Sequence, residues 1–122
     1  MFLDKQLKAF VPTTMPVKAK SFYRDILGLR LLSEDNYAIE FEANGILLRI
    51  IIVPELKPQA FTVLGWNVND IASMIGYLNS KGIKCENYEF LKQDKSGVWI
   101  SPSGSKVAWF KDPDGNVLSL TE

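Results

Sequence analysis

The sequence contains no histidine and a single cysteine, Cys85. Without histidine, the chain lacks the usual general base for a serine or cysteine nucleophile and the commonest nitrogen ligand of a metal ion. A lone cysteine also excludes a disulfide within the chain. We therefore expect no Ser-His or Cys-His catalysis and no histidine-containing metal site, and we interpret Cys85 as a packed or half-exposed strand residue.

The chain also lacks an excess of charge and a long apolar run. Fourteen Lys and Arg residues balance fourteen Asp and Glu residues, so no net field favours nucleic acid or an anionic membrane. No stretch approaches the roughly 18 apolar residues that cross a bilayer, and residues 1–7 lack the apolar run of a signal peptide. The sequence predicts a cytoplasmic protein with a small-molecule partner and no nucleic-acid or membrane partner.

What is present is enough apolar material for one domain over residues 1–122, because 47% of the residues are hydrophobic. The first half, about residues 1–54, begins with a strand and a helix. The helix starts near Pro16 and ends near Leu27, with Gly28 as its C-terminal cap and an apolar residue every three or four positions. The strands predicted in this half are residues 7–11, 29–32, 37–41 and 45–53.

A linker with two prolines at residues 54–59 precedes the second half, about residues 60–122, where the pattern begins again. A strand at 61–68 leads to a helix with Asn69 as its N-cap, which ends at Gly82. The further strand candidates are residues 83–88, 97–100, 106–111 and 116–120. This repeat predicts an α+β fold in which two βαβββ modules form a curled mixed sheet around a concave cup for a small ligand.

Two motifs connect this pattern to a known family. The motifs are SFYRDILGL at residues 21–29 and FKDPDGN at residues 110–116. In this order within a doubled βαβββ pattern, they closely resemble the glyoxalase/bleomycin-resistance/dioxygenase superfamily, also called vicinal oxygen chelate proteins. The resemblance covers nearly the whole chain. It implies the cup-forming fold and a homodimer, while the motif residues themselves suit helix packing and a hairpin turn.

Metal-dependent members of this family hold a divalent ion in the cup with His, Glu or Gln side chains. The resemblance places the four ligand positions on Lys8, Arg49 (or Leu48, if the register shifts), Val63 and Ser119. None of these residues is a normal metal ligand, and two cationic side chains would repel a metal ion. We therefore expect no metal and no cofactor. The alternative is an all-carboxylate site built from Glu40 and Glu42.

The predicted lining of the cup is mostly apolar with a few cationic and amide groups. With strand alternation, the predicted ligand-binding residues are Lys8, Phe10, Arg49, Val63, Asn67, Trp109 and Ser119. Arg49 is suited to bind an anionic group and Trp109 to stack on a ring. The alternative interpretation is that Lys8 extends into solvent and that Arg49 pairs with Glu40 across adjacent strands.

Other candidate features have simpler interpretations. Trp66 and Trp99 are interpreted as packing residues. The loop at residues 101–105 contains three serines and a glycine, which suggests a phosphate cradle, but no helix follows it, so we interpret it as a hairpin loop at the rim of the cup.

The function that these features favour is a metal-free protein that binds a hydrophobic or aromatic small molecule with an anionic group. No convergent acid and base pair identifies catalytic residues. The alternatives are a metal-independent lyase or isomerase, in which Lys8 moves a proton and Arg49 stabilises an enolate, and a metal-dependent glyoxalase or dioxygenase.

Overall fold

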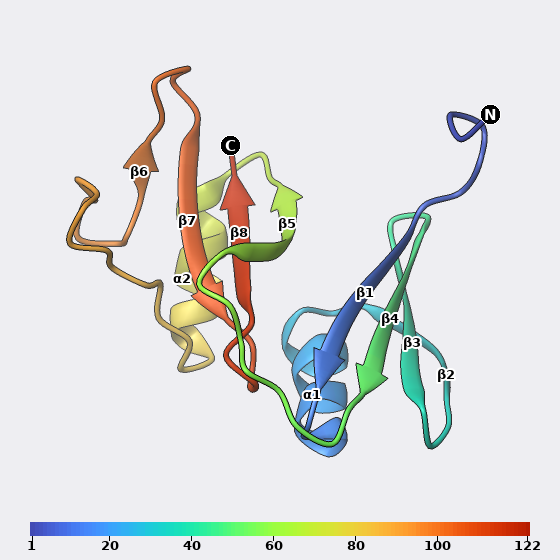
Figure 1. The fold of residues 1–122 in the computed structure, drawn as a ribbon. Helices are drawn as coiled ribbons and strands as arrows, with labels where there is room; N and C mark the ends of the chain where they lie inside the picture. Colours follow the sequence, from blue (N-terminus) through green and yellow to red (C-terminus); the bar gives the residue numbers. More distant parts are fainter. The chain divides into compact units, whose positions relative to one another are not determined.

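The computed structural model describes residues 1–122 and contains eight strands, two α-helices and one π-helical segment (Figure 1). In chain order the elements are β1 (Lys8–Thr13), α1 (Pro16–Ser21), the π-helical segment (Phe22–Ile26), β2 (Arg30–Glu34), β3 (Ala38–Ala43), β4 (Ile46–Ile52), β5 (Thr62–Asn67), α2 (Ile71–Ser80), β6 (Trp99–Ile100), β7 (Lys106–Lys111) and β8 (Val117–Thr121). They form two compact units, Met1–Lys57 and Pro58–Glu122, and the boundary falls in the predicted linker.

The first unit is a mixed sheet with the strand order β1-β4-β3-β2. β1 runs parallel to β4, whereas β3 is antiparallel to both of its neighbours. Alternate side chains form a buried apolar face, which contains Val11, Ile39, Phe41, Leu48 and Ile50. The ring of Tyr23, from the π-helical segment, packs here at 6.1 Å from the Phe41 ring, so the first motif anchors the helix to the sheet.

The second unit repeats this topology with the strand order β5-β8-β7-β6. β5 runs parallel to β8, and β7 is antiparallel to both of its neighbours. The buried residues of its core face and of α2 are Ile71, Ile75, Leu78, Ala108, Phe110, Leu118 and Leu120, and Val117 of β8 is buried as well. Trp66 pairs with Leu120 in the register and stacks on Phe110 at 6.5 Å, which agrees with its interpretation as a packing residue.

Both helices differ from their predictions for local reasons. The first helix widens before its end, because the Leu27 N–H donates to the Phe22 carbonyl five residues earlier. The second helix is capped by Asp70, whose carboxylate accepts the Ser73 N–H at 3.1 Å and the Ser73 hydroxyl at 2.7 Å. The predicted N-cap at Asn69 is therefore wrong by one position, since the carboxylate at the next residue takes the exposed N–H.

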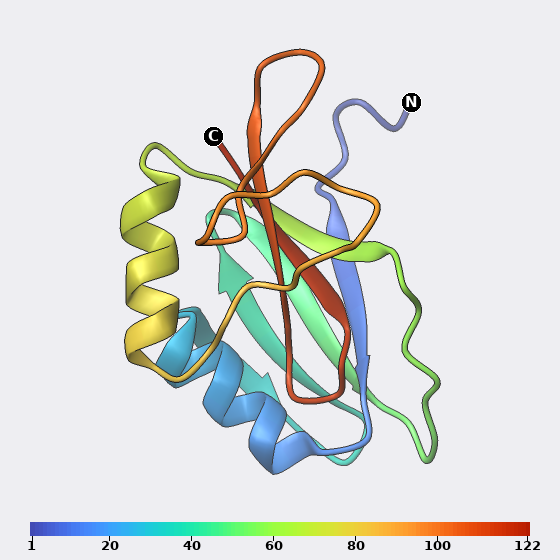
Figure 2. The same ribbon diagram turned by 90° about the vertical axis from the view of Figure 1, so that its left-hand side faces the viewer.

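The structure confirms the α+β fold of two βαβββ modules, with corrections in the second half. The chain between α2 and β6 is irregular (yellow to orange in Figure 2), so the strand predicted at residues 83–88 is wrong. The strand predicted at 97–100 is shortened to β6. Residues 83–88 nevertheless lie beside β7, because the Glu86 N–H donates to the Trp109 carbonyl at 2.8 Å.

The second motif forms the tight turn that its sequence predicts. The buried Asp112 carboxylate accepts the backbone N–H groups of Asp114 and Asn116 and the Asn116 side-chain amide at 2.9–3.0 Å. Gly115 adopts a positive φ of 88°, which glycine tolerates. Residues 101–105 form the expected hairpin loop between β6 and β7, closed by hydrogen bonds between Ser101 and Ser105.

Neither α-helix has the length and apolar character needed to span a membrane.

Candidate functional site

Three of the predicted ligand-binding residues lie together on the face of the first sheet opposite its buried core. Phe10 pairs with Arg49 in the register, and Lys8 precedes Phe10 by two positions on the same strand. The Lys8 Nζ lies 5.8 Å from the centre of the Phe10 ring, a cation–π distance. Glu40 is the neighbour of Arg49 on β3. We call these four residues the charged face of the first sheet.

Arg49 forms an ion pair with Glu40, so the cross-strand pairing considered in the sequence analysis is confirmed. The Arg49 Nη1 lies 2.7 Å from the Glu40 Oε2, with side chains 31% and 22% exposed. This hydrogen bond is the main reason why the pKa of Glu40 lies below its ordinary value; a hydrogen bond from Ser33 and the charge of Lys8 add to it, against the opposing effect of burial. Arg49 therefore already has an anionic partner.

Two further predicted residues meet on the corresponding face of the second sheet. Ser119 on β8 pairs with Gly65 on one side and with Trp109 on the other, which places these three residues in one row across the sheet. A Cβ at position 65 would collide with the Ser119 Oγ, so a side chain here would force the Ser119 hydroxyl to move. The Trp109 side chain thus projects on the face opposite the buried Phe110.

The remaining two predicted residues, Val63 and Asn67, lie on either side of Gly65 along β5. Val63 is the extra residue at a shift in the register between Thr62 and Leu64, and its side chain is 37% exposed. Asn67 is exposed at the end of the strand. The structure therefore groups Trp109 with Ser119 and leaves Val63 and Asn67 at the margins of that row.

Three aromatic side chains gather beside Trp109 on this face. The ring centres of Trp99 and Tyr88 lie 6.0 Å and 5.5 Å from that of Trp109, and Tyr88 meets it edge to face. The ring of Phe90 lies 5.6 Å from that of Tyr88. We call Tyr88, Phe90, Trp99 and Trp109 the aromatic cluster. Trp99, interpreted from the sequence as a packing residue, packs against Trp109 on this open face.

The irregular loop that supplies Tyr88 and Phe90 is fixed by one side chain, Gln93. Its Oε1 accepts the Tyr88 N–H at 2.7 Å, and its Nε2 donates to the carbonyls of Glu86 and Gly97 at 2.9 and 2.7 Å. The amide of Gln93 therefore provides the hydrogen bonds that a neighbouring strand would otherwise make. This arrangement holds Tyr88 against Trp109 without a regular strand.

Two adjoining pockets open beside the aromatic cluster. The aromatic pocket has a volume of about 160 Å³ and is lined mainly by Phe61, Tyr88, Phe90, Leu91, Trp109 and Val117. The Lys111 pocket has a volume of about 230 Å³ and is lined mainly by Pro58, Gln59, Tyr88, Lys111, Gly115 and Val117. Burial raises the pKa of Tyr88 and the charge of Glu86 raises it further, so the phenol stays protonated at neutral pH.

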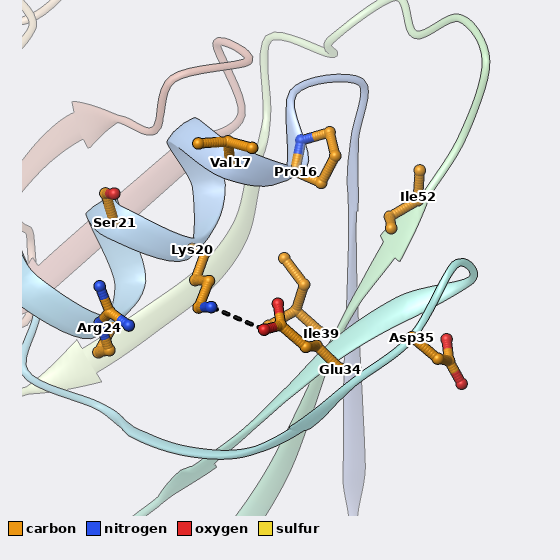
Figure 3. A pocket seen from close by; sticks show the side chains of 9 residues that line it. All are labelled: Pro16, Val17, Lys20, Ser21, Arg24, Glu34, Asp35, Ile39 and Ile52. Carbon is orange, nitrogen blue, oxygen red and sulfur yellow. Dashed lines mark hydrogen bonds and ion pairs between the residues drawn. The ribbon is translucent and has the colours of Figure 1, made fainter.

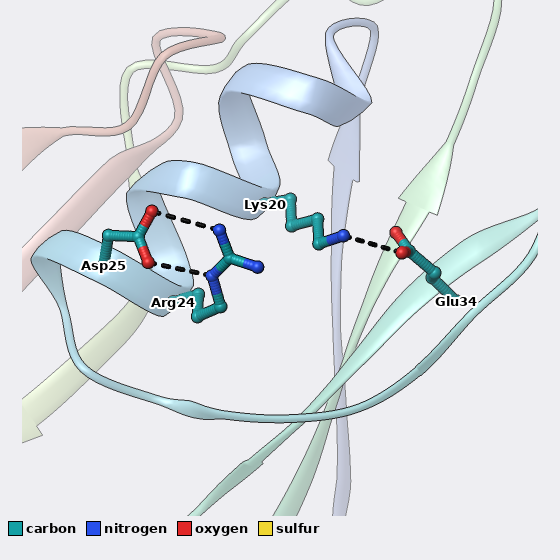
Figure 4. Close-up of polar contacts among 4 residues, drawn as sticks. All are labelled: Lys20, Arg24, Asp25 and Glu34. Carbon is teal, nitrogen blue, oxygen red and sulfur yellow. Dashed lines mark hydrogen bonds and ion pairs between the residues drawn. The ribbon is translucent and has the colours of Figure 1, made fainter.

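A third pocket lies in the first unit, beside α1 (Figure 3). Its volume is about 280 Å³, and apolar Val17, Ile39 and Ile52 contribute to its lining. The Lys20 Nζ lies 2.7 Å from the Glu34 Oε1 (Figure 4). In the same view, Arg24 donates to both carboxylate oxygens of Asp25 at 2.8 and 3.2 Å. These hydrogen bonds raise the pKa of Arg24 and lower that of Asp25.

The charged groups of this α1 pocket therefore already neutralise one another. A ligand with an anionic or cationic group would have to compete with these ion pairs for Lys20, Arg24 or Glu34. The aromatic pocket has no such competition at its ring-lined wall, since Trp109 and Phe90 offer apolar surface to a ligand. We therefore take the aromatic cluster and its two pockets as the candidate site.

The four positions that the resemblance assigns to metal ligands do not fit a divalent ion. Lys8 and Arg49 present cationic groups, and Val63 has no donor atom, which leaves only the hydroxyl of Ser119. The alternative carboxylates are engaged, because Glu40 accepts from Arg49, while Glu42 accepts from Arg30 at 2.7 Å and from the Gly45 N–H. No group of three or more His, Cys, Asp or Glu side chains is placed to hold a metal ion.

The comparison with known families agrees with the motifs and the fold. The sequence model of the Glyoxalase/Bleomycin resistance protein/Dioxygenase superfamily matches residues 6–120. The chain belongs to this superfamily. Among its relatives, a protein of Escherichia coli strain K12 named "Uncharacterized protein YaeR" is 31% identical over 119 residues, which cover 85% of this chain and 84% of the relative.

Two solved structures extend the superfamily assignment to the fold. The bleomycin resistance determinant encoded on transposon Tn5 has a TM-score of 0.75 at 21% identity, with 97% of both chains covered. A lactoylglutathione lyase from Agrobacterium tumefaciens has a TM-score of 0.75 at 16% identity, with 98% of this chain and 93% of that chain covered. At these identities, the similarity shows the superfamily fold alone.

Several side chains that line the candidate site were not in the predicted ligand-binding set. Tyr88, Phe90 and Lys111 were not among the predicted ligand-binding residues, although Lys111 follows Trp109 by two positions and therefore shares its face. Strand alternation with the family register did predict that Lys111 faces the cup together with Trp109. Tyr88 is the last residue of the segment that was predicted as a strand, and Phe90 lies beyond it. The gathering of these two rings beside Trp109 therefore had no signal in the sequence.

Proposed function

We propose that this superfamily member binds a small aromatic molecule that carries an anionic group, without a metal ion and without changing the ligand chemically. The observation that supports this most directly is the aromatic cluster. Four rings with centre distances of 5.5–6.0 Å between neighbours lie beside a pocket on an open sheet face, where a further ring can stack or meet them edge to face.

The proposed ligand-binding residues come from both sheets. They are Lys8, Phe10, Arg49, Val63, Asn67, Trp109 and Ser119, to which we add Tyr88 and Phe90. Trp109 provides the central stacking surface, and the charged face of the first sheet is a second, more polar ligand surface.

The absence of metal is part of the proposal and rests on donor chemistry. Two of the four family ligand positions carry cations, Lys8 and Arg49, and a cation repels a metal ion at short distance.

The proposal also places the protein in the cytoplasm as a homodimer, as the resemblance and the sequence imply. The dimer is tested by light scattering on the eluate of a sizing column.

A nuclear magnetic resonance titration tests the proposed function. The three tryptophan indole N–H signals are recorded while indole-3-acetate is added to metal-free protein. We expect the Trp109 signal to move most and the Trp99 signal to move less. The Trp66 signal is the internal control, because its ring stacks on Phe110 at the buried face.

A parallel thermal-shift series separates metal from organic ligands. The melting temperature is measured with the aromatic acid, and with Ni, Zn, Mn and Fe(II) one at a time. A ligand at about 100 times its dissociation constant stabilises the folded state by about 2.7 kcal/mol, which raises the melting temperature measurably. Stabilisation by a metal alone, with no indole shift, would contradict the proposal and favour a metal-dependent enzyme.

A further inference from the structure

The aromatic pocket and the Lys111 pocket share three lining residues, Ala60, Tyr88 and Val117. We propose that they are two lobes of one site for an aromatic carboxylate of one or two rings, whose ring lies against Trp109 and whose carboxylate lies at Lys111. This inference rests on the proposed function, and it adds the position of the anion and the size class of the ligand.

The register of the second sheet places both groups on one face. Trp109 and Lys111 are two positions apart on β7, and Lys111 pairs with Val117 on β8. Tyr88 stands between the two lobes, since its ring meets Trp109 edge to face and also lines the Lys111 pocket. A ligand that contacts both lobes therefore passes along the Tyr88 ring.

Lys111 is more available to a ligand than Arg49. The Lys111 Nζ lies 3.4 Å from the Glu86 Oε1, and the two side chains are 48% and 33% exposed. Arg49 holds Glu40 at 2.7 Å, with both side chains less exposed. A longer and more exposed ion pair contributes less to the stability of the folded state. A ligand carboxylate should therefore displace Glu86 from Lys111 more readily than it displaces Glu40 from Arg49.

The volumes of the lobes limit the size of the ligand. At about 160 and 230 Å³, the two lobes together reach only the lower end of the roughly 300–1,000 Å³ that pockets for drug-sized ligands occupy. The site therefore suits a ring with a short acidic arm. A ligand with several linked ring systems would extend beyond both lobes.

The experiment compares two probes that differ only in charge, indole-3-acetate and indole-3-acetamide, by calorimetric titration of the full chain. We expect the Lys111→Met variant to bind indole-3-acetate about fivefold more weakly, as for the loss of one exposed charge pair, and to bind the neutral amide as the wild type does. Lys111→Arg keeps the charge and is expected to restore the affinity for the acid.

The chain offers a closely matched control at the other end of the same strand. The Lys106 Nζ lies 3.4 Å from the Glu122 Oε2, and these side chains are 50% and 31% exposed. Lys106→Met thus removes an ion pair of the same length and exposure without touching either lobe. We expect it to leave the affinity for both probes unchanged, and the melting temperature of each variant reports any loss of folding.

The possible outcomes distinguish this inference from the proposed function. If both probes bind but Lys111→Met weakens neither of them, or weakens both equally, the position of the anion is wrong while the aromatic site stands. If Arg49→Met rather than Lys111→Met weakens the acid selectively, the anion lies at the charged face instead. If neither probe binds and the Trp109 indole signal stays in place, the proposed function fails and this inference fails with it.

Discussion

The open faces of the two sheets have the same strand order and nearly opposite chemistry. In the first sheet, Arg49 on the strand that pairs in parallel with β1 is neutralised by Glu40 at 2.7 Å. In the second sheet, Ser119 occupies the strand that pairs in parallel with β5, and its neighbour is Trp109. The same topology therefore carries an ion pair on the open face of the first sheet and an aromatic cluster on the open face of the second sheet.

The two units also differ in the loops that connect their strands. The strands of the first unit follow one another through tight turns, such as the one at Asn44 and Gly45. The second unit inserts the irregular chain between α2 and β6, and this insertion carries Tyr88 and Phe90 to Trp109. The aromatic cluster thus depends on a few register positions and one loop, more than on the βαβββ module itself.

The largest effect is expected from replacing the central ring. Trp109→Ala should weaken indole-3-acetate binding about thirtyfold, or about 2 kcal/mol, because a buried aromatic anchor dominates the binding energy of such a site. Phe10→Ala, the matched aromatic change on the first sheet, should weaken it no more than about threefold. Calorimetric titration measures both, and a larger effect of Phe10→Ala would move the aromatic site to the first sheet.

The next effect concerns the loop that only the second unit has. Gln93→Met removes three hydrogen bonds at 2.7–2.9 Å and should lower the free energy of unfolding by about 1.5 kcal/mol, together with a weaker affinity for the ligand. Gln93→Glu keeps the acceptor for the Tyr88 N–H but sets a carboxylate oxygen against the Glu86 and Gly97 carbonyls, so a loss at least as large is expected. Urea unfolding checks this, with exposed Lys92→Met as the control; equal stability of the Gln93 and Lys92 variants would show that the loop does not depend on Gln93.

A smaller effect tests the row across the second sheet. Gly65→Ala should lower the free energy of unfolding by about 1 kcal/mol, since the new Cβ meets the Ser119 Oγ. In a Ser119→Ala background the same change should be nearly neutral, because the Ser119 Cβ lies 3.7 Å from the added atom, an ordinary contact. A double-mutant cycle measures this coupling, and additive effects would contradict the close approach of β5 and β8.

The smallest effect tests the charged face of the first sheet through pH. Because the pKa of folded Glu40 is lowered from an ordinary value of 4.5, its contribution to stability is present above that pH and is lost as the pH falls below it. Glu40→Gln should therefore reduce the acid-induced loss of stability by less than about 1 kcal/mol. Unfolding between about pH 3 and pH 6 measures the difference, and Glu55→Gln, in the exposed linker, is the control. An unchanged acid dependence in Glu40→Gln would show that the ion pair adds nothing.

Part of the site followed from the sequence. The positions of Lys8, Arg49 and Ser119 were predicted from the family resemblance, and that of Trp109 from the alternation of side chains along a strand. The pairing of Arg49 with Glu40 was anticipated as an alternative, since opposite charges at the same height of adjacent strands attract. The sequence could not decide between that pairing and a free guanidinium.

The repeated βαβββ order, the superfamily and the chemistry excluded by the absence of histidine could be derived without a structure, because periodicity, turn residues and composition are local properties. The loop after α2, the hydrogen bonds that Gln93 makes to it and the contact of Tyr88 with Trp109 are properties of the folded chain. These contacts join residues whose approach depends on packing and on hydrogen bonds between distant parts of the chain. No local pattern encodes such an approach, and for that reason the aromatic cluster became visible only in the folded second unit.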